Sequence, residues 1–398
     1  MGQNSMGNAS ILTLNAGSSS VKFGLFSATN EPQARFTGQL DGIGTDAHLK
    51  VKRADGTVII DTDIAEDAAP NPGAGLPIIL TALDDIVADL VVEAVGHRIV
   101  HGGVDFDGPV VLTDETLNKL DALTPFAPLH QPHNLAGVAA ARAAFPNAPQ
   151  IGCFDTAFHR THPWVNDTFA LPRALYDKGV RRFGFHGLSY EYISGRLDEI
   201  APLYQDGNVV VAHLGNGASM CAIRDGHSVG STMGFSALDG LPMGTRCGQL
   251  DPGVVLYLMD QMEMGAAEIE HMLYRESGLL GLSGVSSDMR RLLVSQEPAA
   301  AQALDYYVTR IRREIGAMAV IMGGLDAVVF TGGIGENAFQ IRERVCQKMT
   351  FLGMELDATR NRENGQVIST DRSRVRLFVI PTNEELMMAR HVMRLGVH

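Results

Sequence analysis

Hydrophobic and polar residues alternate along the first half of the chain in a pattern that predicts an α/β fold. An apolar strand opens it, a Gly-Ser turn follows, and a second apolar strand comes after the turn. Further on, two short strands flank an Ala-Asp-Gly turn, which is typical of a hairpin. The predicted strands are 11–14, 21–26, 48–53, 57–61, the stretch entering GHRIVHGG, and 150–154. The predicted helices lie near 76–90, after Thr113, and at 134–144, where Pro146 ends the last one.

The second half repeats this order of strands and then helices. Its predicted strands are 209–213, 218–224, 326–330 and 375–380. Helices dominate 254–323, another follows the TGGIGEN motif, and a final one begins in PTNEEL. Because strands precede helices twice, the pattern predicts two related α/β domains.

Length and composition agree with two globular domains. The 398 residues exceed the size of one ordinary core, and 45% hydrophobic with 19% charged residues excludes a disordered or fibrous chain. The formal net charge is -13 and no basic stripe occurs, which argues against nucleic acid as a partner. The 43 glycines cluster in short motifs, as expected where backbone approaches a ligand.

The distribution of cysteine and apolar residues favours a cytoplasmic protein without a membrane segment. The four cysteines contain no CxxC pair and indicate no disulfide framework. The first ten residues are polar and lack the basic and apolar regions of a signal peptide. The apolar stretch 317–330 is interrupted by glycine and Asp326 before it reaches the length of a membrane span.

Two glycine-rich hairpins are candidate phosphate-binding turns. In LNAGSSSVKF, glycine, hydroxyl groups and Lys22 suit phosphate oxygens, although a polar turn with a surface lysine explains this motif equally well. The second hairpin carries Gly215-Asn216-Gly217 at its tip, which is also an ordinary type I′ turn signal. Two such hairpins in one chain favour a phosphate clamp. The GxxxxGK[ST] P-loop does not occur in the sequence.

The TGGIGENA segment combines a strand, a glycine turn and a helix. Gly333 and Gly335 permit close approach of a nucleotide to the helix N-terminus. The same GxGxxA spacing imitates a dinucleotide fingerprint, but no clean βαβ unit with a ribose-binding acid accompanies it.

Charged residues next to glycine-rich turns are the candidate catalytic groups. Arg98 and Arg246 suit bidentate capture of carboxylate or phosphate oxygens, and a structural salt bridge explains either arginine alone. Asp155 follows an apolar strand, where a carboxylate binds metal or positions a reactant. His186 lies between aromatic residues and a glycine, the setting of a catalyst or of a hydrogen-bonded core histidine. Glu384 begins the last predicted helix. It is either an ordinary acidic residue of a first helical turn or a group near Mg²⁺.

Three histidine pairs resemble zinc motifs and are rejected as such. No pair combines a clear helix with a general-base glutamate in the HExxH form. The pairs are His97/His101, His130/His133 and His159/His162.

Taken together, eight motifs resemble those of the acetate kinases, members of the superfamily that includes hexokinase, actin and the heat-shock chaperone ATPases. The resemblance extends from Leu12 to Arg390, and the motifs occur in the order and at the spacings of that family. They are LNAGSSSVK, GHRIVHGG, FDTAFH, RFGFHGLS, AHLGNGAS, MGTRCGQLDPG, TGGIGENA and IPTNEEL. The resemblance implies two actin-like (ribonuclease H-like) α/β domains with an active-site cleft between them. It places residues 1–156 and 385–398 in one domain and residues 157–384, with the nucleotide site and a dimer contact, in the other.

The resemblance also implies a role for each site residue. Arg98 binds the substrate carboxylate, Asp155 positions it, and His186 and Arg246 stabilise the transferring phosphoryl group. Asn15 and Glu384 lie at a Mg²⁺ site, with Mn²⁺ as an alternative. The implied walls of the acyl pocket are Val100, Leu129, Phe185 and Ala237, the last of which stands where the family usually has proline. The implied nucleotide contacts are Ser18, Ser20, Lys22, His213, Leu214, Gly215, Asn216, Gly217, Asp288, Met289, Arg290, Gly333, Ile334, Gly335, Glu336 and Asn337.

The expected activity is reversible transfer of the γ-phosphoryl group of ATP to acetate, giving acetyl phosphate and ADP, by a homodimer. A propionate or butyrate kinase is the nearest alternative, because Ala237 changes the pocket wall. An actin-like switching ATPase and a nicotinamide-dependent dehydrogenase are alternatives from other classes. The former needs neither Arg98 nor a small apolar pocket, and the latter rests only on the GGIGENA segment.

Overall fold

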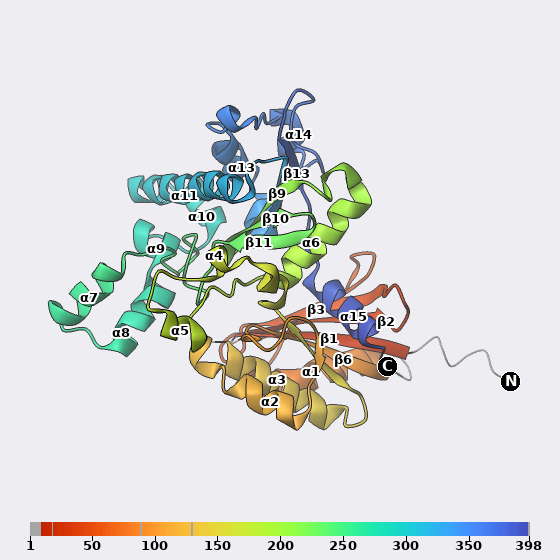
Figure 1. The fold of residues 1–398 in the computed structure, drawn as a ribbon. Coiled ribbons are helices and arrows are strands. Elements are labelled where there is room, and N and C mark those ends of the chain that lie inside the picture. The colour runs from red at the N-terminus through yellow and green to blue at the C-terminus, as the bar shows by residue number, and fades with distance from the viewer. Residues whose placement is uncertain (1–8, 18, 88–89, 129, 397–398) are drawn as a thin grey trace. The chain divides into compact units, whose positions relative to one another are not determined.

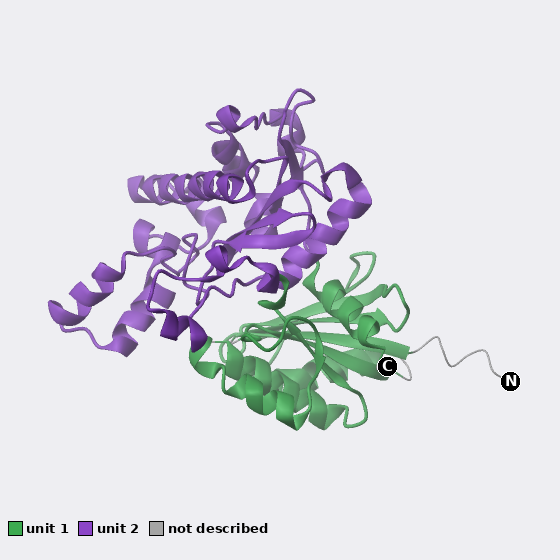
Figure 2. Ribbon diagram, viewed as in Figure 1, with its two compact units in different colours: residues 1–158, 383–398 green, residues 159–382 purple. Residues whose placement is uncertain are grey.

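A computed structural model describes residues 9–17, 19–87, 90–128 and 130–396. The chain divides into two compact units (Figure 2). Unit 1 contains residues 1–158 and 383–398, and unit 2 contains residues 159–382. Serine 18 and leucine 129, both expected at the site, lie outside the described residues.

Unit 1 is built on a mixed sheet in the order β5-β4-β3-β2-β1-β6-β8-β7. The first five strands form antiparallel pairs, whereas β1, β6 and β8 run parallel to one another. The strands are β1 (Ala9–Ala16), β2 (Ser20–Ser27), β3 (Ala34–Asp41), β4 (His48–Arg53), β5 (Val58–Asp63), β6 (Val91–Ile99), β7 (Val110–Val111) and β8 (Gln150–Phe154).

Helices cover both faces of this sheet. Helices α1 and α3 pack on one face and α15 on the other (Figure 1). Asn71 caps α1 by accepting from the Ala74 backbone N–H at 3.1 Å, and Pro72 occupies the first turn, where its missing N–H costs nothing. The α-helices are α1 (Pro72–Ile86), α2 (Asp114–Asp121), α3 (Gln131–Ala144) and α15 (Glu384–Leu395), with 3₁₀ turns at Glu66–Ala68 and Thr124–Phe126 and a third, Ala157–Thr161, at the junction with unit 2.

Unit 2 repeats the central sheet of unit 1. Its strand order is β11-β10-β9-β12-β13, with the first two pairs antiparallel and the last two parallel. The strands β3-β2-β1-β6-β8 of unit 1 have the same order and directions. The prediction of two related α/β halves is therefore confirmed at the level of topology. The strands are β9 (Asn208–Leu214), β10 (Ala218–Arg224), β11 (His227–Ser231), β12 (Ala327–Thr331) and β13 (Arg376–Val379).

The long helix α11 packs on β9, β10 and β11, and α6 lies on the other side of the sheet (Figure 1). Residues 232–251 belong to no helix or strand. The α-helices are α4 (Trp164–Asp167), α5 (Arg173–Asp177), α6 (Gly187–Ile200), α7 (Pro252–Asp260), α8 (Ala266–His271), α9 (Gly278–Ser283), α10 (Met289–Val294), α11 (Pro298–Met322), α12 (Gly332–Asn337), α13 (Phe339–Cys346) and α14 (Ala358–Arg362). The other helical turns are Pro202–Tyr204, Met272–Glu276 and Thr350–Leu352.

Most predicted elements are present, and the differences have local causes. The helix expected near 76–90 begins four residues earlier and ends at Ile86, because the Asn71 cap and Pro72 set its start. Strands β3 and β11 and helix α6 were not predicted. In the described part of the chain, no helix is long and apolar enough to cross a membrane.

Candidate active site

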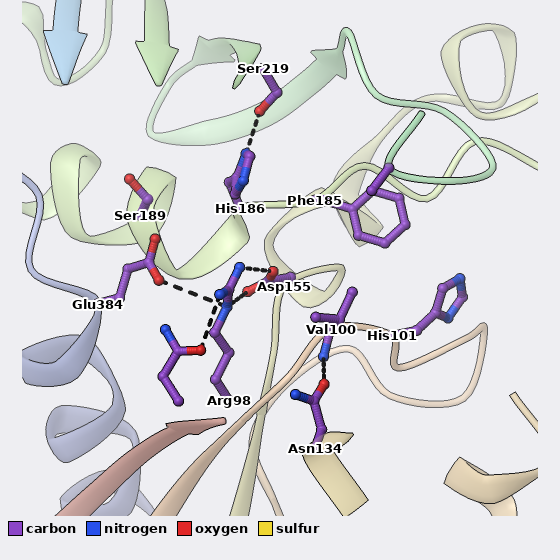
Figure 3. Close-up of polar contacts among 12 residues, drawn as sticks. Arg98, Val100, His101, Asn134, Asp155, Phe185, His186, Ser189, Ser219 and Glu384 are labelled. Atoms are coloured by element: carbon purple, nitrogen blue, oxygen red, sulfur yellow. Dashed lines mark hydrogen bonds and ion pairs between the residues drawn. The ribbon is translucent and has the colours of Figure 1, made fainter. Parts of the chain in front are cut away.

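Arg98 is the centre of a polar network at one edge of the unit 1 sheet (Figure 3). Its Nε donates to Asp155 Oδ1 at 2.9 Å and its Nη2 to Asp155 Oδ2 at 2.6 Å, which makes the pair bidentate. Nη1 donates to Asn15 Oδ1 at 3.2 Å, and Glu384 Oε2 lies 3.8 Å from Nε. The structure thus brings together, within unit 1, four of the residues singled out from the sequence.

The sheet topology explains why these side chains meet. Asn15 lies near the carboxyl end of β1, Arg98 near that of β6, and Asp155 directly after β8. The three strands are adjacent and parallel, so their carboxyl ends share one edge, where ligands of open α/β sheets bind. The Asp155 backbone N–H donates to the Ile99 carbonyl at 3.1 Å and continues the strand pairing up to the site.

The charge balance around Arg98 favours its protonated form. Burial lowers the pKa of its guanidinium, but the charges of Asp155, Glu384 and Glu385 outweigh this effect and raise it overall. Asp155 is only 1% exposed, so its ion pair with Arg98 compensates a buried charge. Burial, followed by the charge of Glu384, raises the pKa of Glu385. The result is a permanent cation at the edge of the sheet.

Backbone hydrogen bonds fix the residues beside this network. Asn134 Oδ1 accepts from the Val100 backbone N–H at 2.9 Å (Figure 3). The Asn134 Nδ2 group donates to the Ala16 carbonyl at 2.7 Å. Asn134 therefore connects Val100, a predicted acyl-pocket wall, to the end of β1. Glu384 is placed by the cap of α15, where Asn383 Oδ1 accepts from the Leu386 N–H at 2.9 Å.

In unit 2, His186 adopts a left-handed conformation, with φ 58°, immediately before α6. Its Nδ1 lies 2.8 Å from Ser219 Oγ (Figure 3), which is also hydrogen-bonded to the Tyr190 hydroxyl. The His186 ring stacks on His213 with centroids 4.3 Å apart, and His213 Nδ1 lies 2.8 Å from Ser189 Oγ. The hydrogen bond at Nδ1 fixes the orientation of the His186 ring and points Nε2 away from Ser219.

Arg246 and His186 approach the same point on the β9–β10 hairpin. A methyl group on Gly217 would lie 3.3 Å from both Arg246 Nη2 and His186 Nε2. The absence of a side chain at Gly217 therefore leaves room for both groups. Arg246 Nη1 donates to the Ala237 carbonyl at 2.9 Å, which anchors its guanidinium.

A separate pocket of unit 2 gathers many of the predicted nucleotide contacts. Its volume of about 790 Å³ is within the range of small-molecule sites. The lining residues predicted from the sequence are Gly215, Asn216, Asp288, Met289, Arg290, Gly333, Ile334 and Asn337. Those that were not predicted are Ser287, Leu293, Val294, Ala338, Phe339 and Gln340.

Other predicted nucleotide contacts do not line this pocket. The Glu336 carboxylate accepts from the Gly332 N–H at 2.9 Å and the Thr382 N–H at 3.2 Å, so it holds the glycine turn in place. Ser20 and Lys22 belong to the β1–β2 hairpin of unit 1, where Lys22 pairs in register with Asn15 and is exposed. The remaining predicted contacts absent from the lining are His213, Leu214, Gly217 and Gly335.

The oxygen donors of unit 1 fit a divalent cation held mainly through phosphate and water. No group of three His, Cys, Asp or Glu side chains that suits a metal exists among the described residues. Magnesium commonly uses only one or two carboxylates, completed by substrate phosphates and water. Glu384 Oε2 lies 3.8 Å from Arg98 Nε, too far for a hydrogen bond, and Asn15 Oδ1 accepts from Nη1 of the same guanidinium.

A model of the acetokinase family matches residues 10–390. The chain belongs to the acetokinase family. It is 57% identical to a protein named acetate kinase from Methylocella silvestris over 393 residues, covering 97% of each chain. It is 51% identical to an acetate kinase from Rhodopseudomonas palustris, over 97% of this chain and 98% of that one. The family assignment makes the chain a phosphotransferase of the kinase class, in a family that uses ATP and ADP as co-substrate pair.

Solved structures agree with this assignment. The crystal structure of Porphyromonas gingivalis acetate kinase matches with a TM-score of 0.86 at 39% identity, covering 98% of this chain and all of that one. A propionate kinase from Francisella tularensis matches with a TM-score of 0.89 at 36% identity, covering 96% and 98%. The fold class predicted from the sequence, actin-like α/β, is thereby confirmed.

Proposed function

We propose that this member of the acetokinase family transfers the γ-phosphoryl group of ATP reversibly to acetate, giving acetyl phosphate and ADP. The observation that carries the proposal is the similarity to acetate kinases over nearly the whole chain. It favours the carboxylate kinase over a switching ATPase or a dehydrogenase. The side-chain arrangement within each unit is consistent with the individual roles.

Arg98 is proposed to bind the acceptor carboxylate. A guanidinium has five N–H donors in a planar fork, and Asp155 and Asn15 engage three of those of Arg98. The other two are proposed to hold the carboxylate of acetate. Asp155 fixes the orientation of the fork, and Val100 and Phe185 are proposed to contact the methyl group together with Leu129 and Ala237.

Arg246 and His186 are proposed to stabilise charge on the transferring phosphoryl group. Phosphoryl transfer needs alignment and charge neutralisation more than covalent help from the protein. Both side chains approach the open space at Gly217. A hydrogen bond to the Ala237 carbonyl fixes Arg246, and one to the Ser219 hydroxyl fixes His186. Such fixed donors need no reorganisation during the reaction.

The unit 2 pocket is proposed to bind the nucleoside of ATP, with apolar contact to the base from Ile334, Leu293 and Phe339. We assign the divalent cation to Asn15 and Glu384. When bound, Mg²⁺ (or Mn²⁺) neutralises phosphate charge.

Acetate is preferred to propionate in this proposal, but the margin is expected to be small. Acetate has four heavy atoms, which limits its binding free energy to about 6 kcal/mol at ~1.5 kcal/mol per atom. One added methylene changes preference by only about 1–3 kcal/mol. The similarity to a propionate kinase makes propionate the second candidate acceptor.

A hydroxamate assay tests the proposal directly. The protein, MgATP and hydroxylamine are incubated with acetate, propionate or butyrate, and the acyl phosphate is detected as its hydroxamate. Acetate is expected to give the highest kcat/KM. Formation of ADP without hydroxamate from any acid would contradict a carboxylate kinase and support a simple ATPase.

A cytoplasmic homodimer is also proposed. Helix α7 buries none of its residues although it is largely apolar, and Leu256 and Tyr257 are 61% and 57% exposed. We assign this face to contact with a second copy, because a large exposed apolar surface marks an interaction site. Light scattering should give a dimer for the wild type and a monomer for Leu256→Arg. A monomeric wild type would refute this assignment.

A further inference from the structure

Two loops of unit 2 are connected to each other beside the predicted acyl-pocket walls. The backbone N–H groups of Phe183 and Gly184 donate to the Gly234 carbonyl at 2.9 and 3.4 Å. Arg182 Nη1 donates to Asp239 Oδ2 at 3.1 Å. The chain that leads to Phe185 is thus joined to residues 234–240.

The ion pair is fixed from several sides. The Arg182 guanidinium carbon lies 4.6 Å from the centre of the Phe169 ring, and Asp239 Oδ1 accepts from the Gly240 N–H at 2.8 Å. A methyl group on Gly234 would lie 2.6 Å from Asp239 Oδ2 and 3.0 Å from Arg182 Nη1. The pair therefore lies directly over the backbone of Gly234, where only glycine leaves room for it.

Ala237 depends on such contacts for its position. It lies within residues 232–251, which form no helix or strand. Alanine, unlike proline, does not fix the backbone angle φ, so neighbouring contacts must hold this part of the loop. Its carbonyl accepts from Arg246 Nη1, so a displacement of this loop would also move the guanidinium assigned to the phosphoryl group.

We propose that Arg182 and Asp239 are positioning residues that determine acyl specificity by holding Ala237 at a fixed distance from Phe185. Arg182 lies three residues before Phe185, and Asp239 lies two residues after Ala237. Their ion pair therefore connects the two chain segments that carry the proposed pocket walls of unit 2. This inference rests on the proposed function.

The expected effect is moderate because the pair is partly exposed, at 33% and 29%. Pairs of this kind contribute about 0.2–1 kcal/mol, or a factor of roughly 1.4 to 5. We therefore expect the ratio of kcat/KM for acetate to that for propionate to fall about threefold when the pair is broken.

The experiment measures this ratio in Asp239→Asn and Arg182→Gln. Asp239→Asn keeps the shape and an acceptor for Gly240 while it removes the charge. Asp239→Glu keeps the charge and is expected to retain most of the wild-type ratio. Arg344→Gln is the matched control, because Arg344 is 29% exposed and pairs with Asp305 at 2.6 Å elsewhere in unit 2.

The outcomes separate the inference from the proposed function. A lowered ratio in both pair-breaking variants, with Arg344→Gln unchanged, supports the inference. An unchanged ratio in Asp239→Asn and Arg182→Gln, even with a lower Tm, overturns it and leaves the pair a structural contact. A wild type that phosphorylates none of the three acids refutes the proposed function itself. If Arg182→Gln does not fold, Arg182→Lys takes its place with the same expected fall, because lysine cannot reproduce the stacked, planar contact.

Discussion

Replacing Arg98 by alanine should lower both the stability of the protein and its kcat/KM for acetate, and the two effects can be measured separately. Asp155 is only 1% exposed and receives two hydrogen bonds from Arg98. Removing one partner of a buried ion pair costs about 3–5 kcal/mol. For a unit of this size, each kcal/mol lowers Tm by about 2–4 °C, so a decrease of roughly 6–20 °C is expected.

The activity effect is measured under conditions in which the variant is folded. We expect Arg98→Ala to lower kcat/KM for acetate strongly, while the Kd for ADP changes little, because the proposed nucleotide pocket belongs to unit 2. Isothermal titration with ADP and the hydroxamate assay measure the two quantities.

A second substitution separates the two causes. In Arg98→Ala/Asp155→Asn, the buried charge is removed with its partner, so much of the lost stability should return while activity remains low. If Arg98→Ala is as stable as the wild type, the buried-charge argument is wrong. If its kcat/KM for acetate is also unchanged, Arg98 does not bind the acceptor.

The other predictions concern unit 2 and the response to acid. Arg246→Ala should lower kcat on the order of 10³-fold with an unchanged circular dichroism spectrum, and near-normal turnover would reject its role. Ser219→Ala should lower kcat more than it changes KM for acetate, because the His186 ring loses its Nδ1 partner; equal kcat would mean that Ser219 does not orient the ring. Burial lowers the pKa of His97 and His159 to about 4, so both stay neutral in the folded protein while the unfolded chain protonates near 6.5. The free energy of unfolding should therefore be constant above pH 6.5 and fall between pH 6.5 and 4, on the order of 3 kcal/mol for each histidine, and denaturation curves that coincide at pH 7 and 5 would contradict this.

The sequence predicted the elements whose signals are local. The hairpins around Gly17 and Gly217 combine apolar strands with turn residues, so the pattern alone locates them. Asp155 follows an apolar strand and Arg98 lies in a glycine-rich segment, so local signals indicate both as candidates. The two side chains meet because β6 and β8 are neighbours in the sheet, and the order of strands in a sheet cannot be predicted from a local sequence pattern.

Elements without local signals could not be predicted. Helix α6 begins after His186, which is left-handed and provides no side-chain cap, so the usual Ser, Thr, Asp or Asn start signal is missing. Strand β3 is half-buried over most of its length and lacks a clear alternation. The roles of Ser219 and Tyr190 were also missed, because their contacts join residues about thirty positions apart.

The return of the chain to unit 1 in helix α15 has a consequence for biosynthesis. This last helix packs on β1 and β6, where Gly96 leaves space for Met388 and Val392, and it also delivers Glu384. The strands of the unit 1 sheet are therefore synthesised well before α15, the helix that covers this face of the sheet. Translation that stops early yields a chain with an uncovered apolar sheet, a substrate for chaperones and proteases rather than a weakened catalyst.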